Sequence, residues 1–121
     1  AQSLTGSQVG VLTDDRHQQA RIRTILGGRV RESLDAGAVV VVAGYQGVCA
    51  ETKEITTLGR GGSDTSAVAL AVGLGAERCQ IYSDVPGVYS ADPRLQGLEP
   101  RLWGELSYDV TLLMSRQGAQ V

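Results

Sequence analysis

The chain has 121 residues, 42% of them hydrophobic, which is enough for one compact domain or for part of one. Its 11 basic and 13 acidic side chains give a formal net charge of -2, so we expect neither a nucleic acid nor an anionic membrane as a partner. The two cysteines lack CxxC spacing, and a single histidine accompanies them, so we expect no metal site and reduced thiols. No apolar run reaches the length of a membrane span, and the first residues lack a secretory signal, which predicts a soluble, cytoplasmic protein.

The first third of the chain predicts short elements separated by polar turns. Residues 9–13 are β-branched and apolar and run into the polar Asp14-Asp15-Arg16, which indicates a strand followed by a loop. Five arginines fall within 16–31, but acidic residues bracket them and no aromatic residue lies among them. This favours a solvated face over a nucleic-acid patch. Residues 32–36 predict the end of a short helix, with Gly37 as its stop.

The middle of the chain holds the clearest strand pattern. Residues 38–44 are continuously apolar, which predicts a strand covered on both faces in a parallel sheet. Residues 45–57 are rich in turn formers and predict a hairpin-like excursion. Ser63 or Asp64 then suits the N-cap of a helix that ends near Gly75, since apolar residues recur behind it at helical spacing.

The last third predicts a strand, a long loop and a final helix. We predict the strand at residues 79–83, the loop at 84–100, where all three prolines lie, and the helix from Ser107 to near Gly118. Alternating strands and helices predict a layered α/β fold. Both ends of the sequence resemble interior segments of a longer chain, so we expect residues 1–121 to be part of a domain.

A glycine-rich turn, Thr57-Leu58-Gly59-Arg60-Gly61-Gly62-Ser63-Asp64-Thr65, opens directly into the predicted middle helix. Its glycines allow a ligand to approach the backbone, and the helix's first N–H groups favour an anion. Arg60 adds a planar fork that matches a carboxylate or a phosphate, and Ser63 adds a hydroxyl donor. Taken alone, an ordinary helix entrance with a surface arginine explains the pattern equally well.

Two common nucleotide-binding fingerprints are absent from the chain. Neither G-x-x-x-x-G-K-[ST] nor G-x-G-x-x-G occurs, so neither a P-loop nor a dinucleotide-binding fold is indicated. The single lysine, Lys53, falls in a predicted surface turn. Phosphoryl transfer needs positive charge near the transferred group, and this chain contributes little lysine charge to such a site.

A second candidate segment, Ser83-Asp84-Val85-Pro86-Gly87-Val88-Tyr89-Ser90-Ala91-Asp92-Pro93-Arg94, starts at the carboxyl end of a predicted strand, where ligands of α/β sheets bind. Asp84 suits ribose hydroxyls or an adenine amino group, Tyr89 offers a flat face, and Arg94 suits phosphate oxygens. A structural loop stiffened by prolines, with Asp92 bonding its own turn, is an equally good interpretation of its second half.

Taken together, the two segments resemble the amino acid kinase family and, within it, the aspartate kinases. The motif G-R-G-G-S-D-T at 59–65 is similar to their aspartate-site signature, and S-D-V-P-G-V-Y-S-A-D-P-R at 83–94 to their nucleotide loop. V-V-V-A-G-Y-Q-G-V at 40–48 and S-L-T-G-S-Q-V-G-V-L-T-D-D at 3–15 extend the match over essentially the whole chain.

The resemblance implies a three-layer αβα sandwich of the amino acid kinase type, with a mainly parallel sheet that is incomplete here. It implies transfer of the ATP γ-phosphoryl group to the side-chain carboxylate of L-aspartate, with Mg²⁺, at the start of the lysine, threonine and methionine pathways. Contact with aspartate and the transferring phosphate is implied for Arg60, Gly61, Gly62 and Ser63. Orientation of a catalytic lysine is implied for Asp64. Binding of ATP is implied for Ser83, Asp84, Tyr89, Arg94 and Gln120.

The sequence departs from the family pattern in two places. The family's amino-terminal K-x-G-G turn does not occur before Arg60, and Gln120 stands where the family's G-A-K-V segment has a lysine. We therefore expect residues 1–121 to be a partial catalytic domain without its regulatory domains, inactive alone, and a homo-oligomer as a full-length protein. The alternatives are a related kinase with another carboxylate substrate and a non-catalytic nucleotide-binding or assembly module.

Overall fold

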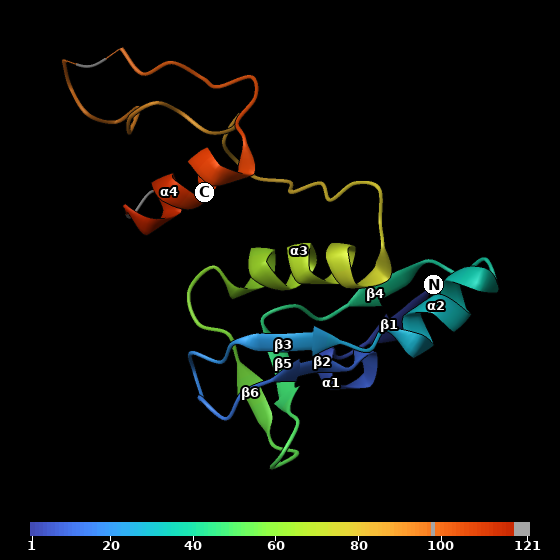
Figure 1. Cartoon of the computed structure of the whole chain (residues 1–121). Coiled ribbons are helices and arrows are strands. Elements are labelled where there is room, and N and C mark those ends of the chain that lie inside the picture. Colours follow the sequence, from blue (N-terminus) through green and yellow to red (C-terminus); the bar gives the residue numbers. More distant parts are fainter. Residues whose placement is uncertain (98, 118–121) are drawn as a thin grey trace. The chain divides into compact units, whose positions relative to one another are not determined.

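The computed structural model describes residues 1–97 and 99–117 (Figure 1). The chain divides into two compact units, residues 1–81 and residues 82–121. None of the helices among the described residues is long and apolar enough to cross a membrane.

The first unit contains six short strands in two sheets. In the smaller sheet, β1 (Gln2–Leu4) pairs in parallel with β4 (Val40–Val42). The larger sheet has the order β3-β2-β5-β6, made by β3 (Ile22–Ile25), β2 (Val11–Thr13), β5 (Gln46–Cys49) and β6 (Ile55–Thr57). The β2–β5 ladder is parallel, and the two outer ladders are antiparallel. The predicted α/β class is confirmed, with an incomplete sheet that is parallel in part.

Three helices belong to this unit: α1 (Gly6–Val9), α2 (Gly28–Asp35) and α3 (Gly62–Leu74). A capping box starts α1, because Thr5 accepts the Gln8 N–H (3.2 Å) while Gln8 accepts the Thr5 N–H (2.9 Å). Gly10, at φ +77°, ends it. The strand predicted at 9–13 therefore begins later, at Val11, because Val9 belongs to this helical turn.

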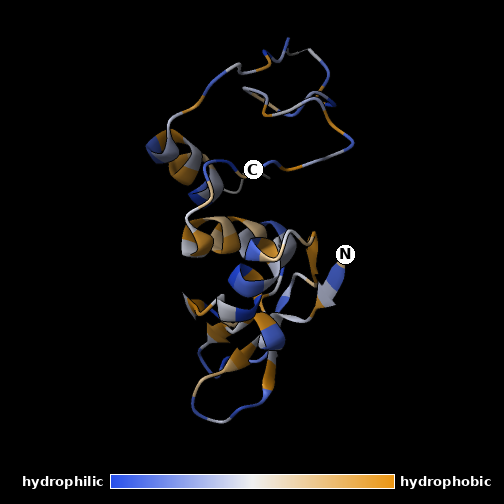
Figure 2. Ribbon diagram, turned by 90° about the vertical axis from the view of Figure 1, so that its right-hand side faces the viewer, coloured by the Kyte–Doolittle hydropathy of each residue, from blue (hydrophilic) through white to orange (hydrophobic). Residues whose placement is uncertain are grey.

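The core of the first unit lies between its strands and helices. Its buried members are Leu4, Val9, Val11 and Val30, and partly buried apolar side chains of β3, β4 and α3 pack against them. Figure 1 shows α3 lying along β3, and Figure 2 shows that much of α3 is hydrophobic. Burial of these side chains supplies most of the stabilisation, since apolar burial is worth about 25 cal/mol per Å².

Three sequence-based predictions for the first unit have different outcomes in the structure. The hairpin predicted at 45–57 is confirmed by the antiparallel β5–β6 pair, but it is not an excursion beyond the sheet's edge, because β5 also pairs with β2. The five arginines are exposed, as a solvated face requires, but the segment also contains β3, which the sequence pattern missed. The strand predicted at 38–44 is shorter, and Val39 and Val41 are 68% and 54% exposed. The expected cover on both faces is wrong here, because within the described residues only the face of β4 that carries Val40 and Val42 packs against the core.

Residues 79–83 are not a strand, which corrects the prediction. Ile81 and Tyr82 are 50% and 90% exposed, and these residues join no ladder among the described ones. Residues that favour strands, such as Ile81 and Tyr82, form one only where a neighbouring strand takes up the backbone hydrogen bonds.

Among its described residues, the second unit contains an isolated antiparallel bridge between Tyr89 and Leu102 and one helix, α4 (Tyr108–Arg116). Ser107 caps α4 by accepting the Val110 N–H (3.3 Å), which confirms the predicted helix start. Gly118, the predicted end of this helix, lies outside the described residues.

Candidate functional site

Two glycines with left-handed backbones shape the turn that precedes α3. Gly59 has φ +83°, and a Cβ atom there would lie 2.8 Å from the carbonyl oxygen of Gln18. Gly61 has φ +73°, and a Cβ atom there would meet nothing within 4 Å among the described residues. Gly59 is therefore required by its conformation and its packing, whereas Gly61 is required by its conformation alone. The surface at Gly61 is open to a ligand.

The start of α3 differs from the predicted one. The N-cap is Gly61, and no side chain among the described residues caps the helix, so the caps predicted at Ser63 and Asp64 are wrong. The left-handed turn at Gly61 starts the helix before either side chain reaches a cap position. The Gly62 N–H donates to the Gly59 carbonyl oxygen (3.0 Å), and the next two N–H groups, of Ser63 and Asp64, have no partner within the helix. Their positive end therefore remains available to an anion.

Gly62 is buried and brings three segments into close contact. A Cβ atom there would lie 2.8 Å from Leu58 Cβ and 2.9 Å from Tyr45 Cδ2. Tyr45 has φ +69°, a conformation that costs a non-glycine residue about 1–2 kcal/mol. Two hydrogen bonds hold it: its N–H donates to Ser66 Oγ (3.2 Å), and its carbonyl accepts the Leu58 N–H (3.0 Å). The glycine-rich turn is therefore packed and bonded to the connection between β4 and β5.

The charged and polar side chains of this turn face solvent. Arg60, Ser63 and Asp64 are all exposed, and none of the ion pairs among the described residues involves Arg60. Asp64 lies in the first turn of α3, where a carboxylate stabilises the positive end of the helix. Together these residues place one guanidinium, one hydroxyl and several backbone N–H groups on a glycine-lined surface. Such a surface suits a carboxylate or phosphate ligand.

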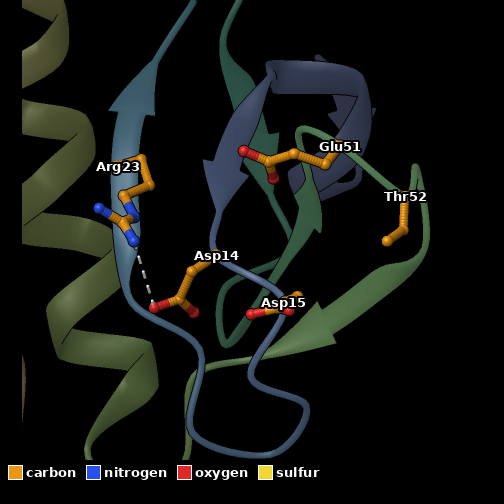
Figure 3. Close-up of a pocket in the computed structure, with 5 residues that line it drawn as sticks. All are labelled: Asp14, Asp15, Arg23, Glu51 and Thr52. Atoms are coloured by element: carbon orange, nitrogen blue, oxygen red, sulfur yellow. Dashed lines mark ion pairs between the residues drawn. The ribbon is translucent and has the colours of Figure 1, made fainter.

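A separate acidic hollow of about 210 Å³ lies where β2 and β5 end (Figure 3). Its lining residues are Asp14, Asp15, Arg23, Glu51 and Thr52. The Arg23 Nη2 atom is 4.0 Å from the Asp14 carboxylate, as the dashed line in Figure 3 marks. The hollow leaves no signal in the sequence, because its acidic residues come from segments almost forty positions apart and form no motif.

Two carboxylates of the hollow, those of Asp14 and Glu51, already have partners within the chain. The backbone N–H of Arg21 (3.0 Å) chiefly holds the pKa of Asp14 below its ordinary value, against the effect of burial, and the N–H of Arg16 adds to it. The Cys49 thiol, 3.2 Å from Glu51 Oε2, lowers the pKa of that carboxyl. Residues 1–97 and 99–117 contain no group of three or more His, Cys, Asp and Glu side chains suited to a metal ion. Asp14 stabilises the connection between β2 and β3, because its carboxylate accepts the N–H groups of Arg16 and Arg21.

The predicted nucleotide segment begins with two exposed polar residues. Ser83 Oγ lies 3.4 Å from Asp84 Oδ1 and also accepts, at 3.5 Å, the N–H of Val85. Tyr89 is half-buried and pairs with Leu102 through the isolated bridge. The bridge fixes the backbone at Tyr89, whereas Ser83 and Asp84 face solvent.

Arg94 and Asp92 form a hydrogen-bonded ion pair at the end of this segment. The Arg94 guanidinium donates to both Asp92 oxygens through Nε and Nη2, each at 3.1 Å, and its backbone N–H donates to Oδ1 at 2.9 Å. The pair lowers the pKa of Asp92 and raises the pKa of Arg94. Asp92 therefore bonds its own turn, and the binding of ATP by Arg94, which stays a prediction, requires the guanidinium to share or leave this partner.

The structure brings the predicted residues together in two groups. Arg60, Gly61, Gly62, Ser63 and Asp64 share the entrance of α3 in the first unit, and Ser83, Asp84, Tyr89 and Arg94 share one loop of the second. Gln120 lies outside the described residues. The family resemblance leads us to expect that both groups line a common cleft. This stays a prediction, because the two groups belong to different units.

Comparison with known proteins gives a consistent family. The sequence model described as the amino acid kinase family matches residues 1–121. Similar curated proteins include the aspartokinases of Corynebacterium efficiens, Corynebacterium glutamicum and Geobacillus stearothermophilus, which are 56%, 55% and 54% identical over 121 residues. These matches cover 100% of this chain but only 28%, 28% and 29% of the relatives, so the chain spans less than a third of their length.

Two solved structures of E. coli aspartokinase III are similar to the chain at 33% sequence identity. The R-state structure, in complex with aspartate and ADP, has a TM-score of 0.65 and covers 76% of this chain and 21% of its own. The T-state structure, in complex with lysine and aspartate, has a TM-score of 0.59 and covers 77% and 21%. The likeness therefore extends from sequence to backbone.

Proposed function

Because the chain belongs to the amino acid kinase family, we propose that its protein transfers the γ-phosphoryl group of ATP to the side-chain carboxylate of L-aspartate. The product is 4-phospho-L-aspartate. The observation that carries the proposal is the glycine-lined, uncapped entrance of α3 beside the exposed Arg60. The sequence identity of 54–56% to proteins named aspartokinase supports L-aspartate as the acceptor.

The entrance of α3 is the proposed aspartate site. Arg60 pairs with a carboxylate through its guanidinium fork, and Ser63 donates from its hydroxyl. Gly61 and Gly62 let the substrate reach the first N–H groups of α3, which the open space at the Gly61 Cβ position permits. The same donors suit the transferring phosphate, since both groups are anionic and rich in oxygen.

The proposed reaction needs alignment more than acid–base chemistry. The aspartate carboxylate is already an anion, so one of its oxygens bonds to the γ-phosphorus without a general base. The bond from that phosphorus to the bridging oxygen breaks, and ADP leaves with its electron pair. The protein's task is to bring two anions into line and to neutralise charge that develops between them. Arg60 contributes to this task, and Asp64 orients a lysine ammonium that comes from outside residues 1–121.

The loop at residues 83–94 is the proposed nucleotide site. Ser83 and Asp84 are exposed and suited to ribose hydroxyls or the adenine amino group, and the Tyr89 ring offers an apolar face. Arg94 supplies positive charge for phosphate oxygens, and Gln120 supplies a hydrogen bond. Mg²⁺ commonly enters such sites bound to the phosphates and to water, with few protein ligands, and it neutralises phosphate charge there.

We further propose that residues 1–121 are part of a larger catalytic domain, which agrees with the 28% of the relatives' length that they span. The full protein would then be a cytoplasmic homo-oligomer that opens the pathways to lysine, threonine and methionine.

Steady-state ADP formation by the full-length protein tests the proposal. Arg60→Gln should raise the KM for L-aspartate by about tenfold or more, which corresponds to the loss of one charge-assisted hydrogen bond. Arg29→Gln is the matched control, because Arg29 is also exposed but belongs to α2. Equal effects of the two changes contradict the proposal. ADP formation that depends on another carboxylate favours a related kinase, and Mg·ATP binding without turnover favours a binding module.

A further inference from the structure

Ser66 joins the first turn of α3 to the connection between β4 and β5. Its Oγ donates a hydrogen bond to the carbonyl oxygen of Ser63 (2.7 Å) and accepts one from the backbone N–H of Tyr45 (3.2 Å). Ser66 is 2% exposed, so its hydroxyl is largely shielded from water. The hydroxyl therefore bridges two segments that are 21 positions apart in the sequence.

Gly44 allows this bridge to form. A Cβ atom at Gly44 would lie 2.8 Å from Ser66 Oγ and 3.6 Å from Ser63 Cα. Gly44 is not among the residues with positive φ, so the close approach, and not the backbone conformation, requires a glycine there. The end of the β4 segment thus passes directly against the first turn of α3, and the Ser66 hydroxyl occupies the space between them.

A serine inside a helix often bonds a carbonyl of the preceding turn, and such a bond has only a local role. The second bond of Ser66 is different, because its donor is Tyr45, which holds the left-handed φ of +69°. The Tyr45 ring in turn approaches the place where a Gly62 Cβ atom would lie (2.9 Å). Ser66 therefore acts on both the conformation of Tyr45 and the position of the α3 entrance.

We propose that Ser66 is a positioning residue for the ligand site at the entrance of α3. Its hydroxyl fixes the spacing between Tyr45 and the Gly62–Ser63 step, so that the helix's first N–H groups are aligned before the substrate carboxylate arrives. Such preorganisation lowers the cost of binding in the correct geometry. This inference rests on the aspartate-binding role proposed above for Arg60, Gly61, Gly62 and Ser63.

Kinetics of the full-length protein test the positioning role. Ser66→Ala removes both bonds and should raise the KM for L-aspartate about tenfold, while the KM for Mg·ATP stays within about twofold. Ser66→Thr keeps the hydroxyl and should restore the KM for L-aspartate to within about threefold of the original. Val30→Ala is the control for lost stability, because Val30 is a core residue, 3% exposed, outside the site. It should lower the unfolding midpoint and leave both KM values unchanged.

Amide hydrogen exchange tests the bridge independently of activity. The Tyr45 N–H should exchange at least tenfold faster in Ser66→Ala than in the original protein. In Val30→Ala, the exchange of the Tyr45 N–H should not increase relative to that of the neighbouring amides. An unchanged Tyr45 exchange rate, or equal KM effects of Ser66→Ala and Val30→Ala, would overturn the inference. A Ser66→Thr protein as impaired as Ser66→Ala would also overturn it.

Two further outcomes separate this inference from the proposed function. If the original protein forms no ADP with L-aspartate, the proposed function fails, and with it the link between Ser66 and aspartate binding. If Ser66→Ala does not fold, Ser66→Cys replaces it, because a thiol fills the same place with weaker hydrogen bonds. Ser66→Cys should raise the KM for L-aspartate about threefold, and a KM equal to that of the original protein contradicts the proposal.

Discussion

Alanine substitution at Gly61 and at Gly75 separates backbone strain from ligand binding. The two glycines flank α3, have φ values of +73° and +72°, and each has open space where a Cβ atom would lie. The left-handed conformation costs alanine about 1–2 kcal/mol, and reduced freedom of the unfolded chain returns about 0.4–1 kcal/mol. Each substitution should therefore lower the free energy of unfolding by about 1 kcal/mol.

Only the change at Gly61 should affect the proposed reaction. In full-length protein, Gly61→Ala places a methyl group on the surface where the substrate carboxylate is expected, and the KM for L-aspartate should rise at least about tenfold. Gly75→Ala leaves that KM unchanged. Denaturant unfolding measures the first quantity, and steady-state ADP formation measures the second. The reasoning is refuted if Gly75→Ala raises the KM as much, or if Gly61→Ala has no effect on it.

Three other changes probe the fold. The pKa of Asp14 is lowered in the folded protein, so its carboxylate stabilises the fold above about pH 4, the ordinary aspartate value, and this contribution disappears as the pH falls through the folded pKa. Asp14→Asn should therefore reduce the loss of unfolding free energy on acidification, measured by urea unfolding from pH 6 to pH 2. Parallel profiles would contradict this. Thr56→Val removes the buried hydrogen bond to Thr13 (2.6 Å) and should lower the unfolding free energy by about 1 kcal/mol. Ser107→Ala removes the cap of α4 and should speed amide exchange in its first turn, while β5 keeps its exchange rates.

Features set by neighbouring residues were predictable from the sequence. Ser107 predicts the start of α4, because a serine side chain can accept the N–H of the residue three positions later in the chain. The hairpin of β5 and β6 follows from the turn-rich residues at 51–54, which lie between the two strands. The glycine-rich entrance of α3 was found for the same reason, since both its conformation and its open surface depend on glycines adjacent in the chain.

Features that depend on distant partners were not predictable in this way. Residues 79–83 have strand-forming side chains, but a strand also needs a neighbour for its hydrogen bonds. The start of α3 was misplaced because residue type alone does not reveal the left-handed φ of Gly61. The acidic hollow combines Asp14 with Glu51, and the Ser66 bridge combines residues 21 positions apart, so neither leaves a motif in the sequence.

Identification of the phosphorylated product tests the central claim most directly. The full-length protein should be incubated with Mg·ATP and, in separate reactions, with L-aspartate, L-glutamate and N-acetyl-L-glutamate, and hydroxylamine should be added to trap an acyl phosphate as its hydroxamate. The account predicts aspartyl hydroxamate in amounts equal to the ADP formed, and no hydroxamate from the other two acids. Hydroxamate from another acid in place of aspartate, or ADP without any hydroxamate, would contradict it.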